Sequence, residues 1–233
     1  MKPSTPSETV RLNKYLALHL GISRREADTL IEDGRVSIND SIASIGSRVA
    51  AGDKVTADKK PVSNETQKIY LLINKPEGYV CSRRSQGGMA TVYELLPKKY
   101  HSLKTVGRLD YASSGLLLLS NDGDFTYRMT HPKFAKNKQY EVELNQELQP
   151  LHQQMISDYG VHLEDGASKL GLERLSDSHR RSWRVIMSEG RNRQIRRTFA
   201  SLGYEVTRLH RTHFGPYTLD NLAPGEFKET MQK

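Results

Sequence analysis

The sequence predicts an α+β protein built from a small N-terminal domain and a larger C-terminal domain. Apolar residues recur with helical spacing in two segments near the N-terminus, and a polar stretch at residues 59–67 shows no periodicity. The remainder contains apolar runs typical of strands, among them four consecutive leucines at Leu116–Leu119. We therefore expect a loose, disordered tail at residues 1–9, a small domain at residues 10–58, a linker at residues 59–67 and a larger domain at residues 68–233.

The small domain is predicted to contain two helices followed by short strands. The first helix is indicated by apolar residues spaced along one face, namely Leu12, Tyr15, Leu16 and Leu20. The run Ser23-Arg24-Arg25-Glu26 fits a capping box and predicts the start of the second helix. Residues 35–38 alternate like a half-buried strand, and residues 54–57 suggest a further short strand.

The larger domain is predicted to alternate between strands and helices. The pattern of Lys138–Leu144 indicates a strand whose inward face carries Tyr140, Val142 and Leu144. A helix is expected at residues 148–159, with one face formed by Leu151, Met155 and Tyr159. A second helix has a face formed by Ile195, Phe199 and Leu202, and a last core strand follows at residues 206–211. The lone Trp183 is expected in the core rather than on a base-stacking surface.

The charge balance favours a polyanionic partner. The 233 residues carry a formal net charge of +8 and a sequence pI of about 9.5, which fits nucleic acid or an anionic membrane surface. A membrane is disfavoured, because no run reaches the roughly 18 apolar residues of a spanning helix and residues 1–9 lack the apolar core of a secretory signal. The single cysteine, Cys81, excludes an intrachain disulfide and a cysteine metal cluster. We expect a cytoplasmic protein.

The stretch Val106–Gly115 carries the strongest functional signal. It reads as a strand that gives way to a polar turn, so Asp110 lies at the edge of a core, where an aspartate usually makes a local turn hydrogen bond. However, the run Gly107-Arg108-Leu109-Asp110, continued by Ser113-Ser114-Gly115, resembles the signature of RNA pseudouridine synthases that modify ribosomal RNA. The resemblance implies that Asp110 is the catalytic residue.

Three further motifs resemble the same family. In Lys138-Gln139-Tyr140, the resemblance implies that Tyr140 packs against the target uracil, whereas the alternative is an aromatic core residue. In the run at residues 189–197, it implies that Arg196 pairs with Asp110. It also makes Arg108 a candidate to fill the space left by a flipped base, and Leu209 a wall of the uracil pocket. Asn74-Lys75-Pro76 resembles a motif beside the active site.

Residues 10–58 resemble the S4 RNA-binding domain, whose members contact RNA phosphates. The predicted RNA contacts of the small domain are Arg11, Lys14, Arg24, Arg25 and Arg35. Those of the larger domain are Lys75, Lys138, Arg191, Arg193 and Arg197. For Arg193 and Arg197 the alternative is a basic, solvated helix surface. The family fold implies a mixed, mostly antiparallel sheet with helices beside it and a cleft across one face.

The function implied by the resemblance is isomerisation of a uridine in ribosomal RNA, which requires neither a cofactor nor a metal. The sequence contains no nucleotide-binding fingerprint and no histidine metal framework. The expected partner is ribosomal RNA or a subunit assembly intermediate, bound by a monomer. The run at residues 78–82 and two C-terminal segments favour 16S over 23S rRNA as the substrate.

Two alternatives stay open. A non-catalytic RNA-binding factor for ribosome assembly, on the same scaffold, fits the charge and the S4-like domain equally well. The combination of Asp110, Tyr140 and Arg196 favours the enzyme, because binding alone does not require these three residues. A DNA-binding protein is disfavoured, since no recognition helix is evident.

Overall fold

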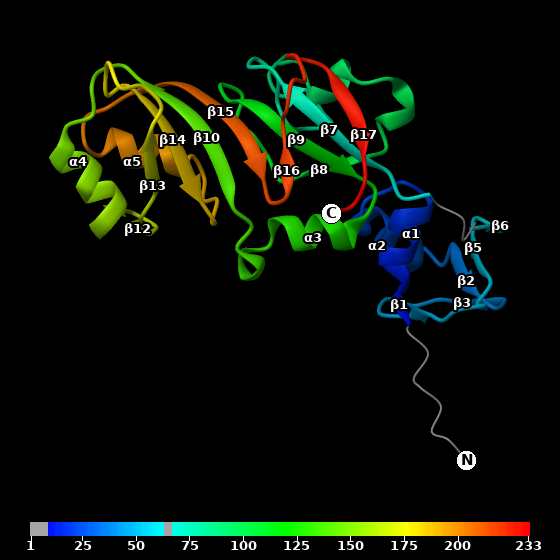
Figure 1. Ribbon diagram of the computed structural model, residues 1–233. Helices are drawn as coiled ribbons and strands as arrows, with labels where there is room; N and C mark the ends of the chain where they lie inside the picture. The colour runs from blue at the N-terminus through cyan, green and yellow to red at the C-terminus, as the bar shows by residue number, and fades with distance from the viewer. Residues whose placement is uncertain (1–8, 63–66) are drawn as a thin grey trace. The chain divides into compact units, whose positions relative to one another are not determined.

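The computed structural model describes residues 9–62 and 67–233, so residues 1–8 of the predicted tail and 63–66 of the predicted linker lie outside the described residues. The chain divides into two compact units (Figure 1). The first comprises Met1–Ile69 with Asn121–Gly123, and the second comprises Tyr70–Ser120 with Asp124–Lys233. No helix in the described parts of the chain is both long and apolar enough to cross a membrane.

The first unit contains the two predicted helices, α1 (Leu12–His19) and α2 (Arg24–Glu32). The predicted capping box is present, because Ser23 Oγ accepts from the Glu26 N–H and Glu26 Oε2 accepts from the Ser23 N–H, at 3.1 and 2.6 Å. The short strands are β1 (Val10–Arg11), β2 (Val36–Ile38), β3 (Ser41–Ile42), β4 (Arg48–Val49), β5 (Val55–Ala57) and β6 (Lys60–Pro61). β1 pairs with β4, and the remaining four form a sheet in the order β3-β2-β5-β6.

The first unit extends beyond its predicted end at residue 58. Asp58 and Lys59 adopt positive φ angles of 50° and 62° and form a tight turn, so that Lys60–Pro61 returns along β5 as β6. Val62 is then buried in the apolar core of this unit. Residues 59–62, which the sequence placed in the linker, thus pack with the first unit, and the pair Asp58-Lys59 is not one typical of such a turn.

The second unit is built on one large sheet (Figure 1). Its main path follows the order β13-β14-β10-β15-β9-β7-β17, with β8 beside β9 and β16 beside β15. The strands are β7 (Tyr70–Lys75), β8 (Lys104–Val106), β9 (Ser114–Ser120), β10 (Lys138–Leu144), β13 (Gly171–Arg174), β14 (Ser182–Met187), β15 (Val206–Phe214), β16 (Tyr217–Thr218) and β17 (Phe227–Thr230). β9 and β15 run parallel, and the other pairs of this sheet are antiparallel. This arrangement confirms the predicted mixed, mostly antiparallel sheet.

Helices and one small hairpin connect these strands. The helical segments are η1 (Val92–Leu95), η2 (Lys98–Tyr100), α3 (Gly123–Thr130), η3 (Pro132–Phe134), α4 (Pro150–Gln154), the π-helix η4 (Met155–Tyr159) and α5 (Gln194–Ala200). The hairpin pairs β11 (Val161–Leu163) with β12 (Gly166–Ser168).

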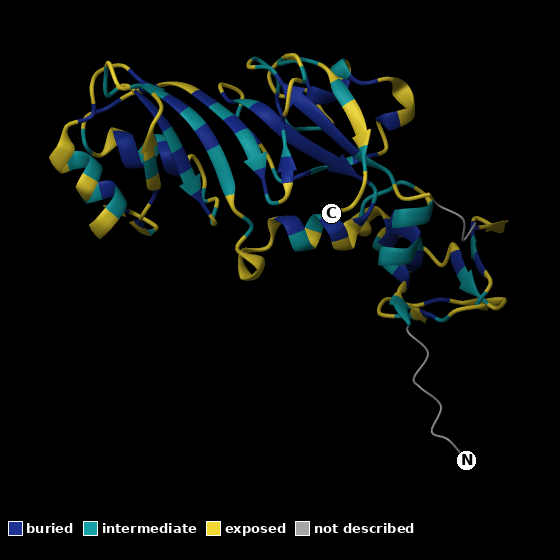
Figure 2. Ribbon diagram, in the orientation of Figure 1, coloured by how far each residue is buried: buried dark blue, intermediate teal, exposed yellow. Residues whose placement is uncertain are grey.

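Burial follows the predicted strand patterns (Figure 2). The four leucines Leu116–Leu119 are at most 1% exposed, as expected of a strand covered on both faces. In β10, the predicted inward residues Tyr140, Val142 and Leu144 are buried and alternate with less buried ones. Trp183 is fully buried, which confirms its expected place in the core.

The predicted face of the segment at residues 148–159 was wrong. Leu151 and Tyr159 are 62% and 76% exposed, whereas Leu148 and Ile156 are fully buried. The segment begins as an α-helix at Pro150 and continues as a π-helix from Met155. Leu151 lies in the α-helical part, so the predicted face was already displaced there, and the π-helix, which has more residues per turn, changes the spacing only from Met155 on.

Candidate active site

A cleft of about 430 Å³ opens in the second unit and collects most of the predicted site. It lies between the loop before β9, the strands β10 and β15, the segment before α5, and the end of α3. The lining residues that matter here are Arg108, Asp110, Lys138, Tyr140, Leu209 and Arg211. The structure therefore brings together residues from separate parts of the chain, most of which sequence motifs had singled out one by one.

The parallel pair of β9 and β15 places the Asp110 loop at this cleft. Ser114 lies opposite His210 and Gly115 opposite Arg211, so the loop that leads into β9 passes beside the middle of β15. Gly115 has a φ of +105°, and a Cβ atom at this position would lie 2.6 Å from the Arg211 amide nitrogen and closer still to its carbonyl oxygen. Glycine is therefore required for the two strands to approach this closely.

Hydrogen bonds fix the backbone of the Asp110 loop. Four consecutive carbonyls, from Asp110 to Ser113, each accept one hydrogen bond. The Ser113 N–H donates to the Asp110 carbonyl at 3.1 Å, and the Gly78 N–H donates to the Tyr111 carbonyl at 2.9 Å. The Arg196 guanidinium donates to the Ala112 carbonyl at 2.6 Å, and the Lys75 ammonium donates to the Ser113 carbonyl at 2.7 Å. Asp110 is half-buried. These four hydrogen bonds fix the backbone from which the Asp110 side chain projects.

Arg196 reaches the loop in a different way from the predicted ion pair. The structure contains no ion pair between Arg196 and Asp110, both of which it describes. Instead, Arg196 donates to the Ala112 carbonyl at 2.6 Å and to the Val206 carbonyl at 2.5 Å. Burial and the nearby Arg193 lower the pKa of Arg196, while attraction to Asp110 opposes this. Arg196 thus acts on Asp110 through the loop backbone and through its charge.

Lys75 lies inside the unit and not at an RNA-binding surface, contrary to its predicted role. It has no exposed area, and its Nζ donates to the carbonyls of Ser113 and Pro76 at 2.7 and 2.9 Å. Burial lowers its pKa, and the nearby Cys81, Glu77 and Asp110 act in the opposite direction. The physical reason for the error is that β7 is covered on both faces up to its last residue.

The position of Tyr140 is compatible with both interpretations that the sequence left open. It is 8% exposed and packs in the sheet, yet it also lines the cleft. Leu209, predicted as a wall of the pocket, lines it as well and is 7% exposed. Arg108 lines the cleft beside Asp110 and is exposed, as a residue that meets RNA must be.

Arg211 is a site residue that sequence reasoning missed. It lies opposite Tyr140 across β10 and β15, is 2% exposed and lines the cleft. Its Nε donates to the Leu116 carbonyl at 2.8 Å and its guanidinium stacks on Phe214 at 4.8 Å, while Nη2 has no partner among the described residues. The signal was present, because strand alternation puts residue 211 on the same face as Leu209.

Lys138 is a half-buried cation that also lines the cleft. Its Nζ donates to the carbonyls of Lys136 and Glu189 at 3.2 Å and of Ser188 at 3.4 Å. Burial and the charge of Arg211 lower its pKa to about 8, against the attraction of Glu189. Lys138 thus fastens the turn at residues 188–189 to β10 and lines the cleft.

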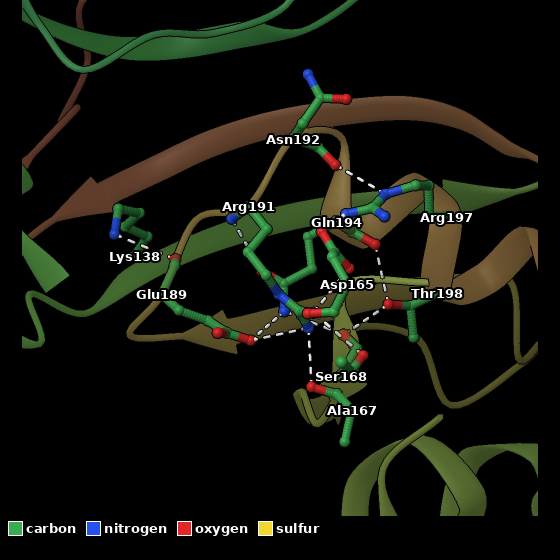
Figure 3. A network of polar contacts seen from close by, with 11 residues as sticks. Lys138, Asp165, Ala167, Ser168, Glu189, Arg191, Asn192, Gln194, Arg197 and Thr198 are labelled. Carbon is green, nitrogen blue, oxygen red and sulfur yellow. Dashed lines mark hydrogen bonds and ion pairs between the residues drawn. The ribbon is translucent and has the colours of Figure 1, made fainter. Parts of the chain in front are cut away.

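Two other predicted RNA contacts belong to an internal polar network (Figure 3). Arg191 and Arg197 both bind Asp165, in the turn of the β11–β12 hairpin, at 2.8 and 2.6 Å. Arg191 also donates to the Ala167 carbonyl, and Arg197 to the Asn192 carbonyl, both at 2.8 Å. The hydrogen bond from Arg197 is the main reason why the pKa of Asp165 is lowered. These arginines dock the hairpin to the start of α5. Arg191 also lines the cleft, as does Arg193, which is exposed.

The predicted contacts of the first unit differ in their local surroundings. Arg11 and Arg25 are exposed, Lys14 is half-buried, and Arg24 is exposed with one hydrogen bond to Asn13 Oδ1 at 3.1 Å. Arg35 is instead held by both carboxylate oxygens of Asp58 at 2.7 Å, which neutralises its charge locally.

Comparison with known proteins identifies the family. A family model described as RNA pseudouridylate synthase matches residues 69–201, and one described as S4 domain matches residues 10–55. The chain belongs to the RNA pseudouridine synthase family. The resemblance seen in the sequence motifs is thereby confirmed. The predicted S4 domain at the N-terminus is confirmed as well.

Individual relatives agree with this assignment. The ribosomal large subunit pseudouridine synthase B of Pseudomonas aeruginosa is 35% identical over 99% of this chain, which spans 62% of the length of that relative. The ribosomal small subunit pseudouridine synthase A of Yersinia pestis is 34% identical, with 94% of each chain covered. A crystal structure described as a pseudouridylate synthase superimposes with a TM-score of 0.68 at 30% identity, covering 95% of this chain and 96% of that one.

Proposed function

We propose that the protein isomerises a uridine of ribosomal RNA to pseudouridine, with Asp110 as the catalytic carboxylate. The observation that carries the proposal is the half-buried Asp110 at the cleft, in a loop whose four carbonyls from Asp110 to Ser113 are hydrogen-bonded. The names of the relatives support ribosomal RNA as the substrate class, since both include a ribosomal subunit.

The reaction needs a carboxylate and a place for a free base. The N-glycosidic bond breaks, the uracil turns, and its C5 then bonds to C1′ of the same ribose while the C5 proton is lost and N1 is protonated. Asp110 attacks C1′ or stabilises the sugar cation as it develops, as carboxylates do in glycoside cleavage. Nothing is oxidised and no group comes from a donor, so the chemistry requires no cofactor.

Each remaining residue has a proposed part. Tyr140 and Leu209 pack on the uracil, and Tyr140 or a water takes the C5 proton. Arg196 and Lys75 act as positioning residues for the Asp110 loop. Arg108 stacks in the space that the flipped uridine leaves, since a guanidinium can stack and also bind phosphate. Arg11, Lys14, Arg24 and Arg25 of the S4 domain are proposed to hold RNA by its phosphates.

The decisive experiment measures tritium release from C5 of labelled uridine. Transcripts of 16S and 23S rRNA and partly assembled subunits are incubated with wild type and Asp110→Asn. We expect release by wild type only, while Asp110→Asn binds the same RNA in a filter assay with unchanged affinity. Release from one of the two rRNAs identifies the substrate. Tight binding without release from any substrate would instead support the assembly-factor alternative.

A further inference from the structure

An aromatic cluster lies where α3 passes into η3. It consists of Tyr127, His131 and Phe134, with Lys133 above two of the rings, and we call it the rim cluster. The Tyr127 ring is 4.7 Å from that of His131 and 5.7 Å from that of Phe134, which it meets at 90°. Lys133 Nζ lies 5.0 Å from the Tyr127 centroid and 4.8 Å from the Phe134 centroid.

The rim cluster is not part of the apolar core. On α3, Phe125 and Met129 face the core and are 2% and 3% exposed. Tyr127 lies on another side of the same helix and is 45% exposed, and Phe134 is 37% exposed. The core therefore provides no reason for large aromatic side chains at these two positions.

Hydrogen bonds fix the backbone turn that carries the rim cluster. The N–H of His131 donates to the Tyr127 carbonyl at 2.9 Å, and the N–H of Phe134 to the His131 carbonyl at 3.1 Å. The Lys133 N–H donates to His131 Nδ1 at 3.2 Å, which fixes the imidazole over the turn. A rigid aromatic surface loses little entropy when a ligand stacks on it.

The rim cluster is continuous with the cleft and lies in a basic segment. Thr130, His131, Pro132 and Lys136 line the cleft, so Tyr127 and Phe134 flank residues that form its wall. Residues 123–138 contain four Lys or Arg side chains and one Asp. Aromatic rings interleaved with cations are the combination that proteins use to bind single-stranded RNA.

We propose that the rim cluster is a stacking site for an unpaired RNA base that flanks the target uridine. This inference rests on the proposed function, because it assumes that RNA enters the cleft. The incoming base stacks on Tyr127 or Phe134, and Lys133 moves from the rings to the adjacent phosphate. The exchange is favourable because a cation–π contact at an exposed site is weaker than a base–aromatic stack.

The first test separates binding from chemistry. Phe134→Ala and Tyr127→Ala are expected to raise KM for the rRNA transcript about tenfold and to leave kcat unchanged, since the stack contributes to binding and does not touch the reacting atoms. Phe134→Tyr and Tyr127→Phe should retain wild-type KM. Tyr159→Ala is the matched control, because Tyr159 is a 76% exposed tyrosine of the same unit that does not line the cleft. Unchanged KM in both alanine variants would overturn the proposal.

The second test uses wild-type protein and so does not depend on the folding of a variant. Transcripts of 16S and 23S rRNA that contain 5-iodouridine are irradiated in complex with the protein, because iodouracil couples to aromatic side chains stacked on it. We expect a cross-linked peptide containing Tyr127 or Phe134. Cross-links confined to other peptides would overturn the proposal, even where tritium release upholds the synthase function. Absence of tritium release would overturn the function alone, since the cross-link does not require turnover.

Discussion

Lys75 places a positive charge inside the larger unit without any exposed surface. An ammonium without water is costly unless its protons are bonded, and here two carbonyls accept from it. One of them is Ser113, three residues after Asp110. One hydrogen bond of Lys75 therefore holds the Asp110 loop, while the other goes to the neighbouring Pro76, and we propose that Lys75 is a positioning residue rather than an RNA contact.

Replacing Lys75 should impair chemistry and spare RNA binding. Lys75→Met keeps most of the volume but removes both donors, so the Asp110 loop loses one of its four anchors. We expect kcat to fall about 10- to 100-fold, since misplacing a reacting group by about 1 Å costs roughly that much. The RNA dissociation constant and its salt dependence should stay at wild-type values. A salt slope reduced by about 1 would show instead that Lys75 contacts a phosphate.

Lys138 is expected to make the free energy of unfolding rise with pH, which is the opposite of a lysine whose pKa is raised by an ion pair. Its pKa is about 8 in the folded state, against 10.5 for an unperturbed lysine. Below pH 8 both states carry the proton and the folded state bears the full desolvation cost. Between pH 8 and 10.5 the unfolded state binds more protons, so the free energy of unfolding rises with pH.

The variant Lys138→Met isolates this effect, because methionine does not titrate. We expect the free energy of unfolding of wild type, relative to the variant, to rise by up to about 3 kcal/mol between pH 7.5 and pH 10. Urea unfolding at several pH values measures the difference. Parallel curves for the two proteins would show that the folded-state pKa of Lys138 is not lowered.

The parallel pair β9–β15 is the structural element on which the site depends. Antiparallel strands surround it, and its register sets the loop before β9 beside Leu209 and Arg211. Local sequence patterns predicted both strands but not that they pair, because Ser114 and His210 are 96 positions apart. The pattern at residues 148–159 predicted the wrong buried face, since Leu151 and Tyr159 are exposed and Leu148 and Ile156 are buried.

Gly115→Ala should destabilise this element strongly. The new Cβ would lie too close to backbone atoms of Arg211, which cannot rotate away, and the φ of +105° is strained for any L residue. We expect the free energy of unfolding to fall by about 3 kcal/mol or more, measured in urea. Gly203→Ala is the control, since Gly203 also has a positive φ, of +84°, but no atom within 4 Å of the new Cβ. Gly203→Ala should lower the free energy of unfolding by about 1–2 kcal/mol, which is the backbone strain alone. Equal losses in the two variants would refute the steric argument.

At the scale of the whole molecule, the chain combines an S4 domain with a synthase domain. The two compact units have separate apolar cores, one of which contains Leu12, Leu16 and Ile31 of the S4 domain. The cleft is formed by the second unit alone. This division suggests that phosphate contacts of the S4 domain contribute affinity, while the synthase domain provides the chemistry.

Removing S4 arginines should therefore change the salt dependence of binding. The double variant Arg24→Ala, Arg25→Ala is expected to weaken RNA binding and to lower the slope of log K against log salt by about 1 for each phosphate that the variant no longer binds. Arg35→Ala serves as the comparison, because Asp58 already neutralises Arg35. The change in slope caused by Arg35→Ala should be less than half of the change caused by the double variant. Filter binding at several salt concentrations measures both. An unchanged slope in the double variant would remove these residues from the RNA contact surface.

The sequence by itself determined the family, the α+β class and the catalytic candidates. Strand alternation, helix spacing and the residues of a motif are local properties, and they can be recognised without the tertiary structure. Asp110, Tyr140 and Leu209 all reach the cleft as their motifs implied. The tertiary structure alone decided what each cation does. Arg196 binds a carbonyl 84 residues away, and Arg211 one 95 residues away. The sequence does not show whether a lysine or arginine is buried, paired or free. Long-range strand pairing determines which of these environments the side chain enters.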